Sequence, residues 1–223
     1  MSIIVQPYKL KGEGSGFRTY VNGTAVSRKP VELERAIQQW DALKKAGEGN
    51  RTKAYALSET DMKKVIPTLK VISYPDLLKA SSIDQVLDEK GRLMLLYLTE
   101  NRSTGHWVCL LKLRGTNIIE YFDPYGHYKP DGEKKWLTPS KRREFGQDTD
   151  YLTELLNSSG YVIKSNAIPF QKDKADINTC GRHCLTRLYF KHLTLPQYAD
   201  MVKSTGIPAD DFVTGFTQRL IGR

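Results

Sequence analysis

The sequence predicts an α+β fold with a central mixed β-sheet flanked by helices. Two observations predict it: β-rich runs alternate with short helical segments after Leu69, and the last third of the chain carries apolar residues at helical spacing. With 223 residues the chain is long enough for one sizeable core. We therefore expect an N-terminal extension over residues 1–60 and a main domain over residues 61–223.

The extension is expected to contain an arm and a helix. The first 29 residues mix Gly, Ser and Lys with scattered apolar residues, which indicates an irregular arm or a short hairpin. Beyond Pro30, apolar side chains recur at helical spacing until Gly47, a residue suited to the left-handed cap that ends a helix. These features predict an amphipathic helix followed by an exposed linker.

The main domain is expected to begin with a short helix. Ser58 and Asp61 have the spacing of a capping box, and Pro67 limits the helix that follows. Further along, residues 114–117 are typical of the turn of a hairpin. The expected strands cover residues 69–74, 92–99, 106–113, 118–122 and 161–164; the expected helices cover residues 76–79, 82–87, 149–156, 180–190 and a last segment with Phe212, Phe216 and Leu220 on one face.

Composition narrows the class of protein. Lys and Arg outnumber Asp and Glu by 34 to 25, and the net charge of +9 attracts nucleic acid or an acidic protein partner without selecting between them. Three cysteines cannot all pair within one chain, so we expect free thiols and a reducing compartment. The apolar runs are far shorter than a membrane span, and the first residues lack a signal-peptide pattern, so neither secretion nor a membrane partner is expected.

The predicted hairpin carries a histidine and a carboxylate. His106 opens one strand and Asp123 closes its antiparallel neighbour, so the turn brings both to the same end of the sheet. The Asp123 carboxylate can accept the imidazole N–H, orient the ring and favour its protonated form beside a thiolate. The hairpin thus offers a general base and an acid that orients it.

A third group, Cys180, opens a predicted helix, where the partial positive charge of the N-terminus lowers a thiol pKa. Asn178 or Thr179 can cap this helix, and the Cys180 backbone N–H is a candidate oxyanion donor. Gln171 can add a side-chain amide from the preceding loop, and Gly181 would let a substrate backbone come close. These residues indicate a thiol nucleophile with an oxyanion hole.

The other cysteines and histidines favour plainer interpretations. Cys109 and Cys184 are expected to pack in the core. Cys180, His183 and Cys184 form a partial zinc pattern, but no second cluster completes a four-ligand site, so no metal is expected. His127, just beyond the hairpin, could line the same cleft.

An ordered set of residues resembles the adenain-like cysteine proteases. The same set resembles the ubiquitin-like-protein-specific proteases and related proteases of large DNA viruses, virophages and polinton elements. The resemblance covers roughly residues 65–200, and its specificity lies in the order His, acid, Gln, Cys, the reverse of papain's Cys-first order. The residues that carry it are Gly105-His106-Trp107, Tyr121 to Gly126 with Asp123, Gln171, and Thr179-Cys180-Gly181.

The resemblance implies an adenain-like fold and a role for each residue. Cys180 would be the nucleophile, His106 the general base and acid, Asp123 the orienting acid, and Gln171 with the Cys180 amide the oxyanion hole. Trp107 would line a narrow channel that admits a glycine-containing substrate segment, whereas the residues alone leave a buried core position equally open. The loop between Gln171 and Cys180 looks slightly longer than is usual in the family and is expected to bulge.

The resemblance also implies a function. It indicates a cysteine endopeptidase that cleaves viral capsid or structural precursor proteins, at small glycine-containing motifs, during virion maturation. It would act in the virion and in the host-cell cytoplasm or nucleus. Two alternatives stay open: a deconjugating protease for ubiquitin-like proteins, and a non-catalytic nucleic-acid-binding protein associated with the capsid.

One charged segment bears on these alternatives. Lys129 to Arg143 carries six basic residues against two acidic ones and interrupts the regular elements, as a solvated loop or as a nucleic-acid patch. No cofactor is required for the expected chemistry, but the resemblance implies stimulation by DNA or by an activating peptide.

Overall fold

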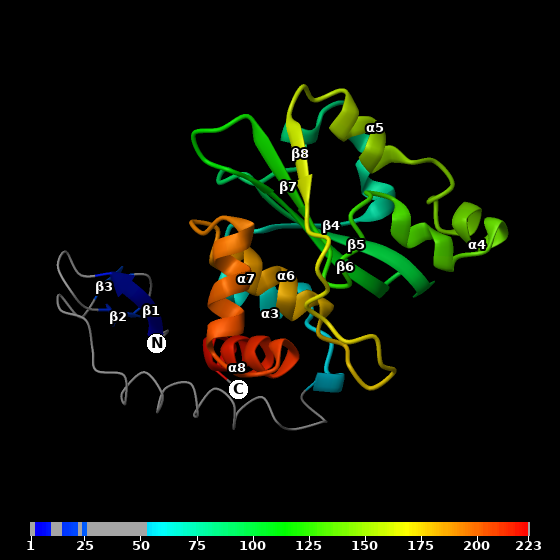
Figure 1. Ribbon diagram of the computed structural model, residues 1–223. Helices are drawn as coiled ribbons and strands as arrows, with labels where there is room; N and C mark the ends of the chain where they lie inside the picture. Colours follow the sequence, from blue (N-terminus) through cyan, green and yellow to red (C-terminus); the bar gives the residue numbers. More distant parts are fainter. Residues whose placement is uncertain (1–2, 10–14, 22–23, 26–52, 223) are drawn as a thin grey trace.

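The computed structural model describes residues 3–9, 15–21, 24–25 and 53–222. The N-terminal part forms a three-stranded antiparallel sheet of β1 (Ile3–Lys9), β2 (Ser15–Val21) and β3 (Thr24–Ala25) (Figure 1). Of the two forms expected for the first 29 residues, the hairpin is the one found. The amphipathic helix expected after Pro30 lies outside the described residues.

The main sheet has five strands of mixed direction, as the fold class predicts. The three central strands pair antiparallel, and each edge strand pairs parallel with its neighbour. The predicted hairpin is confirmed as the β6–β7 pair. In order across the sheet, the strands are β4 (Lys70–Ser73), β5 (Arg92–Asn101), β6 (Thr104–Lys112), β7 (Ile118–Phe122) and β8 (Val162–Ser165).

Successive strand residues point into two apolar cores on opposite faces of the sheet, as the period of a β-strand requires. Met94 and Cys109 enter one core, whereas their neighbours Leu95 and Leu110 enter the other. Helices α3 (Glu59–Val65), α6 (Cys180–Tyr189), α7 (Leu195–Ser204) and α8 (Ala209–Ile221) gather over the first core (Figure 1). The second core is closed by η1 (Tyr74–Lys79), η2 (Ile83–Gln85) and α5 (Tyr151–Asn157).

The capping box predicted at Ser58 is confirmed at the start of α3. The Ser58 hydroxyl accepts the Asp61 N–H at 3.2 Å, and the Asp61 carboxylate accepts the Ser58 N–H at 3.3 Å. The helix ends before Pro67. Within the part of the chain that the structure describes, no helix is long and apolar enough to span a membrane.

The basic segment, expected as a solvated loop or as a nucleic-acid patch, contains helical turns. It forms the 3₁₀ helix η3 (Gly132–Trp136) and the short helix α4 (Pro139–Glu144). Leu137 and Phe145 pack with Leu96 and Leu98 of β5 in a small apolar cluster. Leu137 lies within the basic segment and Phe145 follows it, and together these two side chains hold the segment against the sheet.

A buried ion pair joins α6 to the sheet. Arg187 Nε and Nη2 donate to the two carboxylate oxygens of Glu120 on β7, at 2.6 and 2.8 Å. The same guanidinium donates to the carbonyls of Phe190 and Leu193 at the end of α6. Arg187 is fully buried and Glu120 nearly so. The helix that begins with Cys180 is therefore fixed at its far end by four charge-assisted hydrogen bonds.

Candidate active site

The β6–β7 hairpin brings His106 and Asp123 together. His106 Nε2 lies 2.9 Å from Asp123 Oδ1, and both side chains are buried. The preceding Gly105 allows β6 to lie close to β5, because a Cβ there would be 1.8 Å from the carbonyl oxygen of Tyr97. The two predicted residues are thus within hydrogen-bonding distance, as the hairpin register predicts.

Asp123 is held from two sides. Asn166, just after β8, accepts the Asp123 N–H at 2.9 Å and donates to its carbonyl at 2.6 Å. The Tyr125 N–H donates to Asp123 Oδ1 at 2.9 Å, and the Tyr125 ring stacks on His106 with centroids 4.7 Å apart. These contacts fix both the carboxylate and the imidazole plane.

Cys180 begins α6, and its thiol interacts with the His106 side chain. Burial opposes ionisation of the thiol, but the bond and charge of His106 and the backbone N–H groups of Trp107 and Gly181 hold its pKa below the usual range. Burial likewise opposes the imidazolium, yet hydrogen bonds to Asp123 and Cys180 raise the pKa of His106 to about 10. Both shifts favour a thiolate beside an imidazolium.

The cap of α6 differs from the one expected. Thr179 takes the N-cap position, but its side chain makes no capping hydrogen bond. Its hydroxyl instead donates to Asp210 Oδ1 at 2.5 Å, because Asp210 in the first turn of α8 is buried beside it. Asn178 donates to the carbonyl of Ala54 at 3.0 Å. The residues before Cys180 are therefore fixed by tertiary contacts rather than by a local cap.

Asp210 makes two further contacts around the loop that precedes Cys180. It lies 3.0 Å from His183 Nε2 on α6 and accepts the backbone N–H of Lys172 at 3.1 Å. Its pKa is low despite burial, because His183, Thr179 and Lys172 all stabilise the carboxylate. This single carboxylate ties α8 to both ends of the loop between Gln171 and Cys180.

Gly181 has a packing role that its place in the sequence does not indicate. A Cβ at this position would lie 3.1 Å from both Met62 Cε of α3 and Trp107 Cδ1 of β6. The absence of a side chain at Gly181 therefore lets α6 pack against α3 and β6, and the approach of a substrate backbone to this residue stays a prediction. Trp107 is half-buried and packs against two apolar clusters. Its contact with substrate stays a prediction.

Gln171 lies near the site with its amide hydrogens already engaged. Its Nε2 donates to the carbonyl of Ile177 at 3.0 Å and to the Tyr125 hydroxyl at 3.3 Å. The side chain is buried, and its Oε1 has no hydrogen-bond partner among the described residues. A role in the oxyanion hole requires the Nε2–H to leave one of these acceptors, and it stays a prediction.

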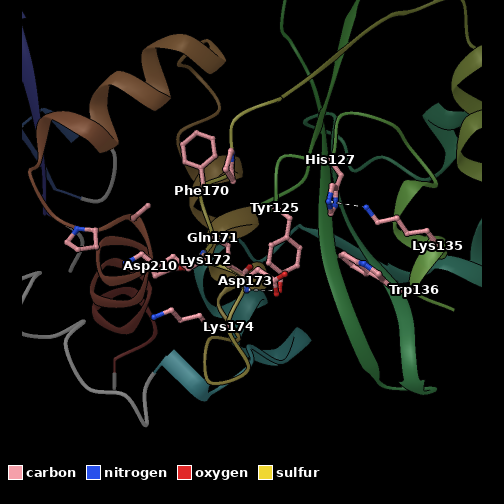
Figure 2. Close-up of a pocket in the computed structure, with 13 residues that line it drawn as sticks. Tyr125, His127, Lys135, Trp136, Phe170, Gln171, Lys172, Asp173, Lys174 and Asp210 are labelled. Carbon is pink, nitrogen blue, oxygen red and sulfur yellow. Dashed lines mark hydrogen bonds between the residues drawn. The ribbon is translucent and has the colours of Figure 1, made fainter.

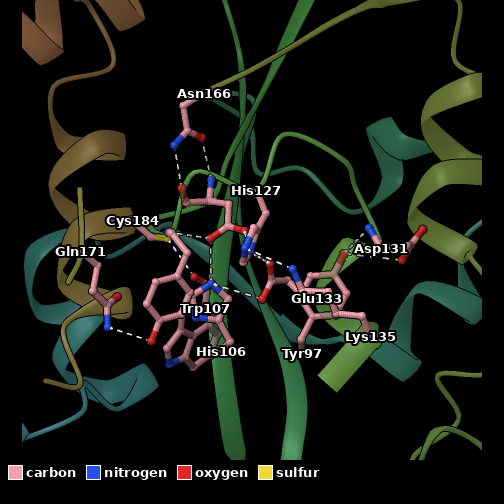
Figure 3. Close-up of polar contacts among 12 residues, drawn as sticks. Tyr97, His106, Trp107, His127, Asp131, Glu133, Lys135, Asn166, Gln171 and Cys184 are labelled. Atoms are coloured by element: carbon pink, nitrogen blue, oxygen red, sulfur yellow. Dashed lines mark hydrogen bonds and ion pairs between the residues drawn. The ribbon is translucent and has the colours of Figure 1, made fainter. Parts of the chain in front are cut away.

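A second carboxylate lies beside Asp123. Glu133 of η3 is buried, with Oε1 2.5 Å from His127 Nδ1 and Oε2 3.9 Å from His106 Nε2. Lys135 Nζ lies 3.2 Å from the other nitrogen of His127 (Figure 3). One side-chain nitrogen of His106 and one carboxylate oxygen each of Asp123 and Glu133 lie within 4.8 Å of one another. The imidazole is therefore surrounded by more acidic groups than the hairpin alone supplies.

A cleft with a volume of about 760 Å³ borders the site. Tyr125 and Gln171, both next to the His106–Cys180 pair, belong to its lining. Figure 2 shows Trp136 and His127 on one side of the cleft, with Lys174 and Asp210 on the other. The Trp136 ring meets His106 edge-on at 5.9 Å and is 46% exposed, so it shields the imidazole and presents an apolar wall to solvent.

Comparisons with known proteins place the chain. No family model matches it. "Uncharacterized protein V9" of Sputnik virophage is 36% identical over 167 residues, which cover 73% of this chain and 94% of that protein. The chain belongs to the V9 family.

Two solved structures are similar to this V9-family chain. The ASFV pS273R protease matches with a TM-score of 0.43 and 15% identity over 77% of this chain and 70% of that one. The C-terminal Ulp1 protease domain, solved in complex with Smt3, the yeast orthologue of SUMO, matches with a TM-score of 0.34 and 14% identity over 87% of this chain and 99% of that one.

The other two cysteines of this V9-family chain are fully buried and free, as expected. Cys184 donates to the carbonyl of Trp107 at 3.3 Å, and Cys109 faces the carbonyl of Cys184 at 3.8 Å. Burial and the neighbouring Cys109 thiol raise the pKa of Cys184 well above its usual value. Of the residues in the partial zinc pattern, His183 contacts Asp210 and Cys184 donates to the carbonyl of Trp107, so each has a separate partner.

Three residues around the site of this V9-family chain were not identified from the sequence. Asn166, Glu133 and Asp210 reach the site from the end of β8, from η3 and from α8, which are distant in the chain. Polar residues near predicted strand ends or in a charged segment are common, so no local pattern marks them. One feature could have drawn attention to Glu133, because it is one of only two acidic residues in the basic segment.

Proposed function

We propose that this chain is a cysteine endopeptidase of the adenain-like type, with the chain order His106, Asp123, Gln171, Cys180. The observation that carries the proposal is the buried Cys180–His106–Asp123 series, in which Nε2 of the imidazole is bound to the carboxylate. Because Nε2 is occupied, Nδ1 is the nitrogen left to face the sulfur. This arrangement is the one a thiol nucleophile needs.

The proposed reaction has two stages. The Cys180 thiolate attacks the scissile carbonyl carbon, and the imidazolium of His106 gives its Nδ1 proton to the leaving amine as the C–N bond breaks. A thioester with Cys180 remains. Neutral His106 then takes a proton from water, the resulting hydroxide displaces the sulfur, and the acid product leaves with the thiolate restored.

The oxyanion would be stabilised at the start of α6. The Cys180 N–H belongs to the first helical turn, where donors have no intrahelical partner. Gln171 would add its amide after releasing Tyr125 or Ile177. Trp107 would contact the substrate segment that approaches Cys180.

The proposed substrates are viral capsid or structural precursors, cleaved at glycine-containing motifs during virion maturation in the virion and the host-cell cytoplasm or nucleus. The relation to a virophage protein supports a viral setting. Cys180 is buried, and the rings of Tyr125 and Trp136 cover its partner His106, which favours a substrate with small residues at the cleavage point. No cofactor is needed for these steps.

Mass mapping of capsid precursors tests this function. Each candidate capsid protein is co-expressed with the wild-type chain or with Cys180→Ala, and new termini are mapped. We expect internal cleavages at glycine-containing motifs with the wild type alone. Identical fragments in both samples would refute the proposal, and cleavage confined to the C-terminal glycine of ubiquitin-like conjugates would favour the deconjugating alternative.

Binding to DNA is a second proposal, and it rests on the exposed cations of the basic segment. Lys129, Lys135, Lys141 and Arg143 are exposed, whereas Lys134 is buried against Thr149 and Asp150. The surface therefore carries fewer cations than the sequence count indicates. The remaining charges line one segment beside the cleft wall formed by Trp136.

We expect the chain to bind nonspecific duplex DNA at low salt. Replacing Lys129, Lys141 and Arg143 with Gln should weaken binding and flatten the dependence of log K on log salt, by about 0.9 for each phosphate that is no longer neutralised. Lys63→Gln with Lys79→Gln, two exposed lysines elsewhere, is the control. Equal weakening in both variants, or no binding by the wild type, would contradict the proposal.

A further inference from the structure

We propose that Glu133 is a neutral carboxylic acid that donates its proton to Asp123 and so positions the carboxylate that orients His106. This inference deepens the proposed function and rests on the Cys180–His106–Asp123 site. Glu133 acts through Asp123 and does not touch the reacting atoms.

Two buried carboxyl oxygens lack hydrogen-bond donors among the described residues. Asp123 Oδ1 accepts from His106 Nε2 and from the Tyr125 N–H. Asp123 Oδ2 makes no hydrogen bond to the described residues, although His127 Nδ1 lies 3.4 Å from it. Glu133 Oε2 has none either, although its other oxygen contacts His127. Both side chains are fully shielded from solvent. A buried acceptor without a donor destabilises the folded state, and more so when it is charged.

One proton satisfies both atoms. If Glu133 Oε2 carries a hydrogen, it can donate to Asp123 Oδ2, and a repulsive pair of carboxylates becomes a hydrogen-bonded acid and carboxylate. A carboxyl oxygen of Glu133 lies within 4.8 Å of one of Asp123, so the two groups face each other across a short gap. A shared proton is a general solution where two buried carboxyl groups meet.

The surroundings decide which group holds the proton. Asp123 faces His106 and the Tyr125 N–H, which favour its charged form, and its pKa is lowered despite burial. Burial and the neighbouring Asp123 raise the pKa of Glu133 to about 9, against the opposing charges of His106 and Lys135. The proton therefore belongs to Glu133.

The neighbours on the other side of Glu133 agree with this assignment. Lys135 Nζ can donate to His127 Nε2, which leaves the proton of a neutral His127 on Nδ1 to donate to Glu133 Oε1. Burial and Lys135 lower the pKa of His127 against the opposing charge of Asp123, and this shift favours the neutral imidazole. The two buried phenols near the pair, Tyr97 and Tyr121, have pKa values far above neutral and add no charge.

The donors then run in one direction, from Lys135 through His127 to Glu133 (Figure 3), and from Glu133 to Asp123. Asp123 receives a hydrogen bond on each oxygen and carries the single negative charge of the pair. With Asp123 fixed on both oxygens, His106 keeps its Nε2–H toward the carboxylate and its Nδ1 toward the sulfur.

The backbone at the start of η3 is fixed in the conformation that turns the Glu133 side chain inward. Asp131, at the start of η3, has a left-handed φ of 66° that costs energy for a residue other than glycine. Its carboxylate accepts from the Tyr74 hydroxyl and from the Thr153 N–H at 2.9 Å, and its own N–H donates to the Tyr97 hydroxyl at 3.0 Å. Contacts from three elements hold the strained residue two positions before Glu133.

The test is the pH dependence of unfolding in wild type and Glu133→Gln, whose amide keeps a donor for Asp123 and an acceptor for His127. Native Glu133 keeps its proton up to about pH 9, whereas the unfolded residue loses it above about pH 4.5, so wild-type stability falls with rising pH in this window. We expect the ratio of wild-type to Glu133→Gln unfolding constants to rise about tenfold per pH unit between about pH 5.5 and 8.5.

A constant ratio across this window would mean that native Glu133 is ionised, and it would overturn the proposal. A stoichiometric metal in the purified protein, whose removal by EDTA abolishes the pH dependence, would also overturn it, because a cation would then bridge the carboxylates. If Glu133→Gln does not fold, the infrared carbonyl band of a protonated carboxylic acid in the wild type at neutral pH decides instead, and its absence refutes the proposal.

The kcat for a cleavable peptide tests whether Glu133 positions Asp123 for catalysis. Glu133→Gln should retain at least about tenfold more kcat than Glu133→Ala, because only Gln can donate to Asp123. Equal kcat values for the two variants would refute the positioning role. The unfolding measurements need no activity, so a failure of this inference and a failure of the proposed protease function are distinguishable.

Discussion

Replacing Cys180 with Ala is expected to lower kcat for a cleavable peptide by roughly 10⁶-fold, the size of effect seen when the nucleophile of a coupled catalytic set is removed. The reason is that the covalent step has no other thiolate available. Cys109 and Cys184 are fully buried in the core, and the pKa of Cys184 is raised. Turnover of a quenched fluorescent glycine-containing peptide measures the decrease.

The matched control for this variant is Cys109→Ala. It removes the same sulfur atom from a core position away from the cleft, so it should cost stability and leave kcat within about tenfold of wild type. Urea unfolding establishes that both variants are folded. Turnover by Cys180→Ala at the wild-type rate would show that another group performs the reaction.

Replacing Glu120 with Ala is expected to lower the free energy of unfolding by about 3–5 kcal/mol, because it leaves the Arg187 guanidinium charged, buried and without its carboxylate. The measurement is the midpoint of urea unfolding at constant m-value. Since Arg187 lies on the helix that begins with Cys180, we expect activity to fall with the fraction folded.

A double variant separates charge from packing. Glu120→Leu with Arg187→Met removes both charges at similar volume and should recover part of the stability, since buried pairs replaced by apolar groups are often neutral. Recovery should be partial, because the carbonyls of Phe190 and Leu193 are left without their donor. A cost below about 1 kcal/mol for Glu120→Ala would show that this pair does not fix α6.

Local sequence patterns account for most of the fold. The capping box at Ser58 and the β6–β7 hairpin each depend on a few neighbouring residues, and both appear where they are expected. The helix that opens with Cys180 also appears where it is expected. The relation of His106 to Asp123 follows from hairpin register, which sequence can supply.

The contacts that complete the site depend on tertiary structure. Asp210 replaces the expected local cap at Thr179 only because α8 packs against α6. Met62 of α3 and Trp107 of β6 meet at Gly181, so this glycine has a packing role that its place beside Cys180 does not indicate. Glu133 resembles a surface acid within a basic segment, and only the fold of η3 turns it inward. Such contacts join residues too far apart in the chain for spacing to reveal.

The pH dependence of Cys180 alkylation tests the central claim most directly. Iodoacetamide reacts with the thiolate, so its rate constant follows the ionisation of the sulfur. His106 lowers the pKa of Cys180, and we therefore predict that the wild type reacts at Cys180 well below the usual thiol pKa of about 8.5, whereas His106→Ala reacts only at higher pH. Coincident pH profiles for the two proteins, or labelling at Cys109 or Cys184 instead, would contradict the account.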